Sequence, residues 1–388
     1  MSKRGAPDAD ARPKRPTLEH FVLGPHLGSG AFGHVFSATY RAEPDSPLRA
    51  VGKEMPAARK PTDVDITDDH VRAHNEREIE LQARLRPCMH APYLIAVDRN
   101  PRTVTLVMER VDYGLLEWLE AMRTNSRPDD QLSTRCLMRQ LMAALHELHR
   151  HGVVHRDIKA ENLRVTAGGL LKVCDYGLAA SLEMPEDRYR LVTLTERPPE
   201  LLLGWVGVAS SIDMWSAGCI AAAILMKRDR QLWPPTGDEN PKIDVCPIVR
   251  ATLQGQVRQL GTPTPAERDY LRTLPFCSQV DGVLFGVRTQ GALHAKLHPH
   301  ANGVTCTALD CAHTLIEGLL RWHPADRLTA AAALQLPYFY SPTPACRHQR
   351  STEAHMPLPQ PRSSAPQPTE ARVHSSTVRS TPASRSHK

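Results

Sequence analysis

Two carboxylates, a cation and a carboxamide stand close together in one stretch of the chain: Asp157, Lys159, Asn162 and Asp175. Phosphoryl transfer requires little covalent chemistry from a protein, but it requires an oriented nucleophile and neutralised phosphate charge. Asp157 would accept or orient a hydroxyl proton, and Lys159 would steady the transferred group. Asn162 and Asp175 offer the hard oxygen ligands that Mg²⁺ prefers. The stretch therefore predicts phosphoryl-transfer chemistry.

A glycine-rich segment near the N-terminus follows the pattern G-x-G-x-x-G-x-V. Strand-like runs at residues 22–24 and 35–38 flank it, so we expect it to join two strands of a hairpin. A dinucleotide-binding fold would instead place a helix after the glycines. Glycines in a hairpin let backbone amides approach nucleotide phosphates closely. The predicted nucleotide-binding residues of this segment are Leu27, Gly28, Ser29, Gly30, Ala31, Phe32, Gly33, His34 and Val35.

The residues around Asp157 resemble the protein kinase signature HRDxKxxN…DFG, with Tyr176 where the family has Phe. Later motifs follow in the family's order: Arg-Pro-Pro-Glu at 197–200, Asp-Met-Trp-Ser-Ala-Gly at 213–218, and Arg327. Small-molecule phosphotransferases share the first motif but lack the later ones. The resemblance implies that Asp213 binds the catalytic-loop backbone and that Arg327 pairs with Glu200.

The resemblance also divides the chain into parts. It implies an α+β, bilobal protein kinase fold over residues 17–340, with a small β-rich N-lobe to about residue 110 and a larger, mainly helical C-lobe from about residue 111. Residues 1–16 and 341–388 are basic tails, the second rich in Ser, Pro and Arg, and we expect both to be disordered. The tails carry +3 and +5 of the formal net charge of +6, leaving about −2 for the kinase region. The basic surplus therefore predicts no direct nucleic-acid binding.

Lys53 stands at the place of the family's strand lysine, which meets the α- and β-phosphates of ATP. By the resemblance, a helix carboxylate holds this lysine. Glu78 is the expected partner, with Glu76 and Glu80 as rivals on the same charged helix. Residues 56–70 exceed the family's usual length, and we expect them to form an extra acidic loop.

Residues 105–111 resemble the strand that leads into the hinge between the two lobes. The resemblance makes Met108 the gatekeeper and assigns the adenine edge to the backbone around Glu109 and Val111. Arg164 stands where the family has an apolar floor under adenine. We expect its stem to pack there with the guanidinium turned outward, at a cost in nucleotide affinity.

Thr193 occupies the position where serine/threonine kinases place a Thr beside the catalytic Asp and Lys. Together with Lys159, it implies protein substrates with Ser or Thr acceptors. The resemblance implies ATP and Mg²⁺ as cofactors. It implies as catalytic residues Asp157, Lys159, Lys53 and Thr193, and as metal ligands Asn162 and Asp175.

Residues 193–204 and Leu-Gly-Thr-Pro at 260–263 resemble the CMGC branch, which holds the cyclin-dependent and MAP kinases and tends to phosphorylate Ser or Thr followed by proline. Thr195 and Glu196 stand where that branch usually has Trp-Tyr, which leaves the proline preference open. No PSTAIRE-like helix surrounds Glu78, so the sequence does not imply a cyclin, and any regulatory subunit is unknown.

The activating phosphothreonine position of that branch falls near Arg188, and residues 176–192 contain one serine and two tyrosines as possible acceptors. One hypothesis is that Glu186 or Asp187 pairs with Arg156 in place of a phosphate, giving activity without an upstream kinase. The alternative is an acidic loop with no role.

Nine cysteines without CxxC spacing and nineteen histidines without an HExxH pattern give no metal or disulfide signature, and they favour a reducing compartment. The longest apolar run, at residues 219–226, is too short to span a bilayer, and the N-terminus has no apolar signal region. We therefore expect an intracellular protein of the cytoplasm, the nucleus or both, with no membrane association. Residues 12–16 fit a nuclear address, although basic tails are commonly just solvated.

Two functions remain open at this point. The first is a serine/threonine kinase that transfers the γ-phosphoryl group of ATP to proteins, and the second is a pseudokinase-type scaffold. The presence of Lys53, Asp157 and Asp175 favours the kinase. Arg164, and Val51 at the place of the usual Ala, are the support for the scaffold.

Overall fold

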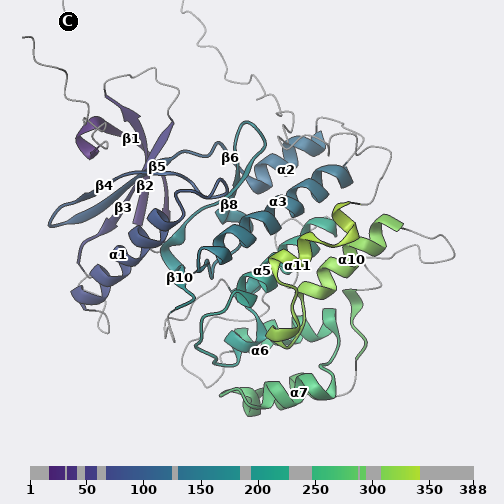
Figure 1. The fold of residues 1–388 in the computed structure, drawn as a ribbon. Coiled ribbons are helices and arrows are strands. Elements are labelled where there is room, and N and C mark those ends of the chain that lie inside the picture. Colours follow the sequence, from purple (N-terminus) through teal and green to yellow (C-terminus); the bar gives the residue numbers. More distant parts are fainter. Residues whose placement is uncertain are drawn as a thin grey trace, which may run out of the picture.

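The two expected lobes are present in the structure, a computed structural model, in which a sheet lobe lies against a helical lobe (Figure 1). This arrangement confirms the predicted α+β, bilobal fold. The structure describes residues 17–30, 33–41, 49–58, 67–124, 130–183, 194–226, 247–286, 289–293 and 307–340.

The N-lobe is built on a five-stranded antiparallel sheet with the order β1-β2-β3-β5-β4. The glycine-rich segment forms the end of the β1–β2 hairpin, as its strand-like flanks predicted. A helix, α1, packs Ile79 against Met55, Leu94 and Leu106 of the sheet. The elements are β1 (Phe21–Gly30), β2 (Gly33–Tyr40), β3 (Ala50–Pro56), β4 (Leu94–Arg99), β5 (Thr103–Glu109) and α1 (Asp68–Arg84).

The start of α1 corrects one expectation from the sequence. Thr67 caps the helix by accepting a hydrogen bond from the backbone of His70, and Asp68 and Asp69 occupy the first turn, where negative charge is favourable. The prediction of an acidic loop through residue 70 is wrong at this end, because the cap and the helix dipole draw these residues into α1. Residues 59–66 lie outside the described residues.

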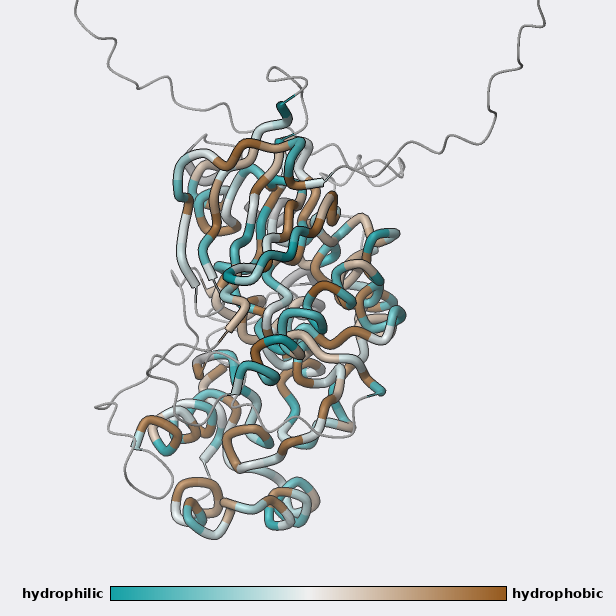
Figure 2. Tube along the Cα trace, turned by 90° about the vertical axis from the view of Figure 1, so that its left-hand side faces the viewer, coloured by the Kyte–Doolittle hydropathy of each residue, from teal (hydrophilic) through white to brown (hydrophobic). Residues whose placement is uncertain are grey.

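The C-lobe surrounds α3 and α5, whose inner faces are completely buried. α3 contributes Leu141 and Leu145. Helix α5 is apolar on nearly every side and is therefore buried within the lobe, Trp215 included. Figure 2 shows hydrophobic and hydrophilic segments alternating along the helices of this lobe, as expected for helices with one buried face. No helix in the described part of the chain is both long and apolar enough to cross a membrane. The main helices are α2 (Leu115–Thr124), α3 (Asp130–Arg150), α5 (Ser211–Leu225), α6 (Pro247–Leu260), α7 (Pro265–Arg272), α10 (Thr307–Leu319) and α11 (Ala330–Leu334).

Short strands between the lobes hold the segments that carry the candidate catalytic side chains. β8 and β9 form a hairpin, and β6 pairs with β8 on its other side. The predicted catalytic loop runs from β7 to β8, and Asp175 follows β9, so the hairpin brings both segments together. The backbone amide of Cys174 donates to the carbonyl of Asn162 at 2.8 Å, which fixes this approach. These strands are β6 (Tyr113–Gly114), β7 (Val153–Val154), β8 (Leu163–Val165), β9 (Leu171–Val173) and β10 (Ala180–Ser181).

Candidate active site

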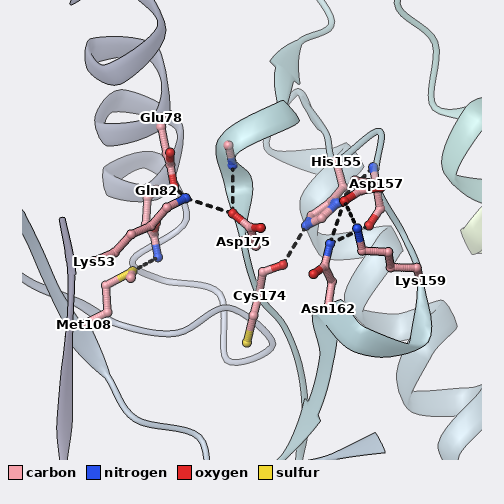
Figure 3. A network of polar contacts seen from close by, with 11 residues as sticks. Lys53, Glu78, Gln82, Met108, His155, Asp157, Lys159, Asn162, Cys174 and Asp175 are labelled. Atoms are coloured by element: carbon pink, nitrogen blue, oxygen red, sulfur yellow. Dashed lines mark hydrogen bonds and ion pairs between the residues drawn. The ribbon is translucent and has the colours of Figure 1, made fainter. Parts of the chain in front are cut away.

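The three polar side chains of the predicted catalytic loop contact one another. Asp157 Oδ2 accepts hydrogen bonds from Lys159 Nζ at 2.7 Å and from Asn162 Nδ2 at 2.9 Å (Figure 3). Asn162 Nδ2 also donates to the Asp157 backbone carbonyl at 2.9 Å. The loop therefore fixes the Asp157 carboxylate between a cation and an amide.

Asp213, at the start of α5, fixes the loop from behind. Its carboxylate accepts hydrogen bonds from the backbone amides of His155 at 2.9 Å and Arg156 at 2.8 Å, and from His149 Nε2 at 2.9 Å. Burial alone would raise the pKa of Asp213, but these hydrogen bonds and the histidine outweigh it, so the pKa is lowered. The bonds also support Arg156 at φ 62°, a left-handed conformation that is strained for a residue other than glycine. The expected structural role of Asp213 is confirmed.

Asp175 adopts a left-handed conformation, with φ 65° and ψ 83°, directly after β9. Its Oδ1 accepts a hydrogen bond from Lys53 Nζ at 2.8 Å. Burial would raise the pKa of Asp175, and the Lys53 ammonium more than offsets this, so the pKa is lowered. Tyr176, in place of the family's Phe, is buried and donates its hydroxyl hydrogen bond to the Val173 carbonyl at 3.0 Å. The extra hydroxyl is thus satisfied within the same segment.

Lys53 lies between two carboxylates from different lobes. Its Nζ is 2.6 Å from Glu78 Oε1 on α1 and 2.8 Å from Asp175 Oδ1 (Figure 3). Burial would lower the pKa of Lys53, but the two carboxylates outweigh burial and raise it. The rival carboxylates have other partners: Glu76 pairs with Arg99 and Glu80 with Arg84. Glu78 is therefore the carboxylate that the fold presents to Lys53.

A cavity of about 410 Å³ lies between the glycine-rich hairpin and the hinge, and Asp175 reaches its edge. This volume lies in the range of small-molecule sites. The predicted nucleotide-binding residues that line it are Leu27, Gly28, Gly30, Gly33, Val35, Lys53, Met108, Glu109 and Val111.

Two of the described nucleotide-binding candidates, Ser29 and His34, do not line this cavity. The Ser29 hydroxyl instead lies between two imidazoles, 2.9 Å from His26 Nε2 and 2.8 Å from His34 Nδ1. Ala31 and Phe32 lie outside the described residues. Thr193, and Glu186 and Asp187 of the hypothetical pair with Arg156, also lie outside them.

Gln82 belongs to the cavity although the sequence reasoning missed it. It lines the cavity and donates from Nε2 to the sulfur of Met108, the predicted gatekeeper, at 2.9 Å. Gln82 follows Glu78 by one helical turn, and residues four apart on a helix share a face. That spacing was the signal that could have identified it.

Arg164 takes a different direction from the one expected. Its Nε donates to the Val111 carbonyl and its Nη2 to the Asp112 carbonyl, both at 3.1 Å. The prediction that the guanidinium turns outward is wrong, because the hinge presents two backbone acceptors within its reach. Arg164 therefore lines the cavity, and its guanidinium ties it to the hinge.

The residues proposed for Mg²⁺ fit a hard cation. Both hydrogen bonds of Asn162 use Nδ2, which leaves Oδ1 to face a ligand. Asp175 uses Oδ1 for Lys53, and 41 % of its side chain is exposed. The described residues contain no group of three or more His, Cys, Asp or Glu side chains arranged to hold a metal. Mg²⁺ commonly takes one or two protein oxygens and completes its shell with phosphates and water, so two ligands agree with that habit.

Comparisons with known proteins agree with this geometry. The family described as "Protein kinase domain" matches residues 21–339. Among similar relatives, mouse "Cyclin-dependent kinase-like 4" is 30% identical over 84% of each chain, and human "Cyclin-dependent kinase 10" is 29% identical over 83% of this chain and 80% of its own. "Cyclin-dependent kinase G-1" from rice is 32% identical over 69% of this chain, and the match spans 38% of its length.

Some relatives are much longer than the segment they share with this chain. The match covers 33% of the length of a probable serine/threonine-protein kinase from Arabidopsis thaliana and 57% of "Serine/threonine-protein kinase ppk23" from Schizosaccharomyces pombe. The chain belongs to the protein kinase family, and its relatives place it in the CMGC branch.

Proposed function

We propose that this chain is an ATP-dependent serine/threonine protein kinase that transfers the γ-phosphoryl group of ATP to protein hydroxyls. The observation that carries the proposal is the position of Lys53 Nζ, 2.6 Å from Glu78 and 2.8 Å from Asp175. A buried ammonium held by two carboxylates at the edge of a cavity is suited to phosphates. No observation favours the pseudokinase scaffold over this function.

Each side chain then has a distinct task. Lys53 neutralises the α- and β-phosphates, while the backbone of the β1–β2 hairpin covers the phosphates and the backbone around Glu109 and Val111 binds adenine. Asp157 orients the acceptor hydroxyl and receives its proton. Lys159, 2.7 Å from Asp157, neutralises the group in transfer.

Asn162 and Asp175 would hold Mg²⁺ through their side-chain oxygens. When bound, the ion screens negative charge on the β- and γ-phosphates. Lys53 keeps the Asp175 carboxylate oriented for this task, and Gly177 assists by donating its backbone amide to Oδ1 at 3.5 Å.

The acceptor is a Ser or Thr of a protein. Thr193, which lies outside the described residues, is the fourth catalytic residue that the family resemblance implies. Several relatives are named cyclin-dependent kinases, but for this chain we propose no cyclin, because the sequence around Glu78 lacks a PSTAIRE-like segment. A peptide array that varies the residue after the acceptor tests the proline preference of the CMGC branch. Enrichment of proline at that position is the expected result if Glu196 substitutes for the usual Tyr without changing the substrate site.

The test of the function is magnesium-dependent transfer of labelled γ-phosphate to a generic basic protein. Asp157→Asn is expected to lower the rate by about 10²–10⁴-fold, since it removes the proton acceptor. Asp326→Asn, which changes an exposed carboxylate of the C-lobe, serves as the matched control and should leave the rate unchanged. If wild type and Asp157→Asn were equally silent while protein partners still bound, the scaffold would be the correct function.

A further inference from the structure

The Lys53–Glu78 contact depends on where α1 lies, because Glu78 is carried by that helix. Glu78 Oε1 binds Lys53, but Oε2 is buried without a hydrogen-bond partner among the described residues. A buried carboxylate oxygen without a partner is costly, and rotation of α1 toward solvent would relieve this cost. The observed position of α1 therefore requires other contacts to hold it.

Asn75 supplies one such contact. It lies one helical turn before Glu78, is 3 % exposed, and donates from Nδ2 to the backbone carbonyl of Pro56 at 2.9 Å. Pro56 is the last residue of β3, the strand that also carries Lys53. The bond thus ties the helix of Glu78 to the strand of its partner lysine.

Glu76 supplies a second contact, to the edge strand β4. Arg99, at the end of β4, donates from Nε to Oε1 at 2.8 Å and from Nη2 to Oε2 at 2.7 Å. These hydrogen bonds lower the pKa of Glu76. Most exposed ion pairs contribute little to stability. A bidentate Arg–carboxylate pair, such as Arg99 with Glu76, is the geometry in which an exposed pair does contribute.

Glu80 offers an internal comparison. It pairs with Arg84 at 3.1 Å, but both residues belong to α1, so this pair ties the helix to nothing else. Glu76 and Glu80 are both more than half exposed, and they differ chiefly in what their partners are attached to.

We propose that Asn75 and Glu76 are positioning residues that fasten α1 to β3 and β4, so that Glu78 stays on Lys53 without help from an activating subunit. The inference rests on the proposed kinase function for its rate measurement. It has an independent structural readout, because Lys53 is 6 % exposed and movement of α1 would remove its Glu78 partner.

The rate experiment compares kcat and KM for phosphate transfer in the full chain. Glu76→Gln is expected to lower kcat about three- to tenfold with little change in KM for the protein substrate. The reason is that a displaced Glu78 would no longer hold Lys53 in place for the phosphates of ATP. Glu80→Gln is the matched control and is expected to match wild type. The double variant Glu76→Arg with Arg99→Glu is expected to recover most of the lost rate. Asn75→Asp replaces the donor with an acceptor that faces the Pro56 carbonyl. We expect this variant to lower kcat more than Glu76→Gln does.

The structural experiment measures acylation of Lys53 by a lysine reagent, followed by mass spectrometry, and does not require activity. Acylation should be several times faster in Glu76→Gln and Asn75→Asp than in wild type or Glu80→Gln. Equal acylation rates in Glu76→Gln and Glu80→Gln would overturn the inference. A charge-swapped variant that transfers phosphate no faster than Glu76→Gln would overturn it as well. A silent wild type with the expected acylation pattern would reject the kinase function and leave the α1 anchor standing.

Discussion

Arg327 donates two hydrogen bonds to the Glu200 carboxylate, from Nη1 at 2.7 Å and from Nη2 at 2.6 Å, and both side chains are completely buried. The same guanidinium also donates to the carbonyls of Ser211 and Arg321 and lies 4.9 Å from the Trp215 ring. This network joins the Arg-Pro-Pro-Glu motif at residues 197–200 to helix α5 of the C-lobe core. It confirms the pairing that the sequence predicted.

We expect Arg327→Met to destabilise the protein by about 3–5 kcal/mol, because it leaves the Glu200 carboxylate buried without its cation. Replacing Glu200 by Gln as well should cost less than the sum of the single changes. Urea unfolding followed by circular dichroism measures both. Arg272→Met is the control, since Arg272 and Asp269 are exposed and 3.6 Å apart. A loss below about 1 kcal/mol for Arg327→Met would contradict a structural role.

Asp213 should make stability depend on pH in the acid range. Its pKa is lowered in the folded protein from an ordinary value of 3.8, so the unfolded chain binds the proton more readily. The stabilisation is therefore complete above about pH 4 and is lost as pH falls through the lower, folded pKa. Asp213→Asn should consequently be less stable than wild type at pH 7, with a gap that narrows below pH 4. Thermal unfolding across pH 3–7 measures the difference in stability between wild type and Asp213→Asn. A difference that stays constant with pH would show that a group other than Asp213 causes the acid dependence.

Arg164→Met should affect stability more than nucleotide binding. The change keeps an apolar stem under the cavity and removes the bonds to the carbonyls of Val111 and Asp112. We expect a loss of about 1 kcal/mol, typical for such hydrogen bonds where water can replace the donor. The shift in melting temperature caused by Mg-ATP should stay similar to wild type, with Val51→Ala as a control on the opposite side of the cavity. A lost nucleotide shift would mean that the guanidinium itself binds the base.

Cys174 should be an unreactive thiol although it lines the cavity beside Asp175. Burial raises its pKa to about 12, which keeps the thiol protonated at neutral pH, and the thiolate is the nucleophile. Alkylation by iodoacetamide at pH 8 should be at least about a hundredfold slower at Cys174 in the folded protein than in urea. Peptide mass spectrometry over time measures both rates. Rapid labelling of the folded protein would contradict the protection.

The sequence by itself determined the fold and the chemical types at the site, through the order and spacing of motifs that resemble those of protein kinases. Strand-like runs on both sides of the glycines indicated the hairpin, and the spacing from Asp157 to Asp175 indicated two adjacent loops with complementary charges. Roles in catalysis and binding remain predictions for Asp157, Lys159, Asn162 and Asp175, although the fold brings these four side chains into neighbouring loops.

Only the tertiary structure decided which of several similar side chains meets which partner. Glu76, Glu78 and Glu80 are alike in type and lie on one helix, and the docking of α1 on the sheet turned Glu78 toward Lys53. The direction of Arg164 was likewise set by hinge carbonyls more than fifty residues away in the chain. Such choices depend on contacts between distant segments, and the free energies of these contacts are absent from any local sequence pattern.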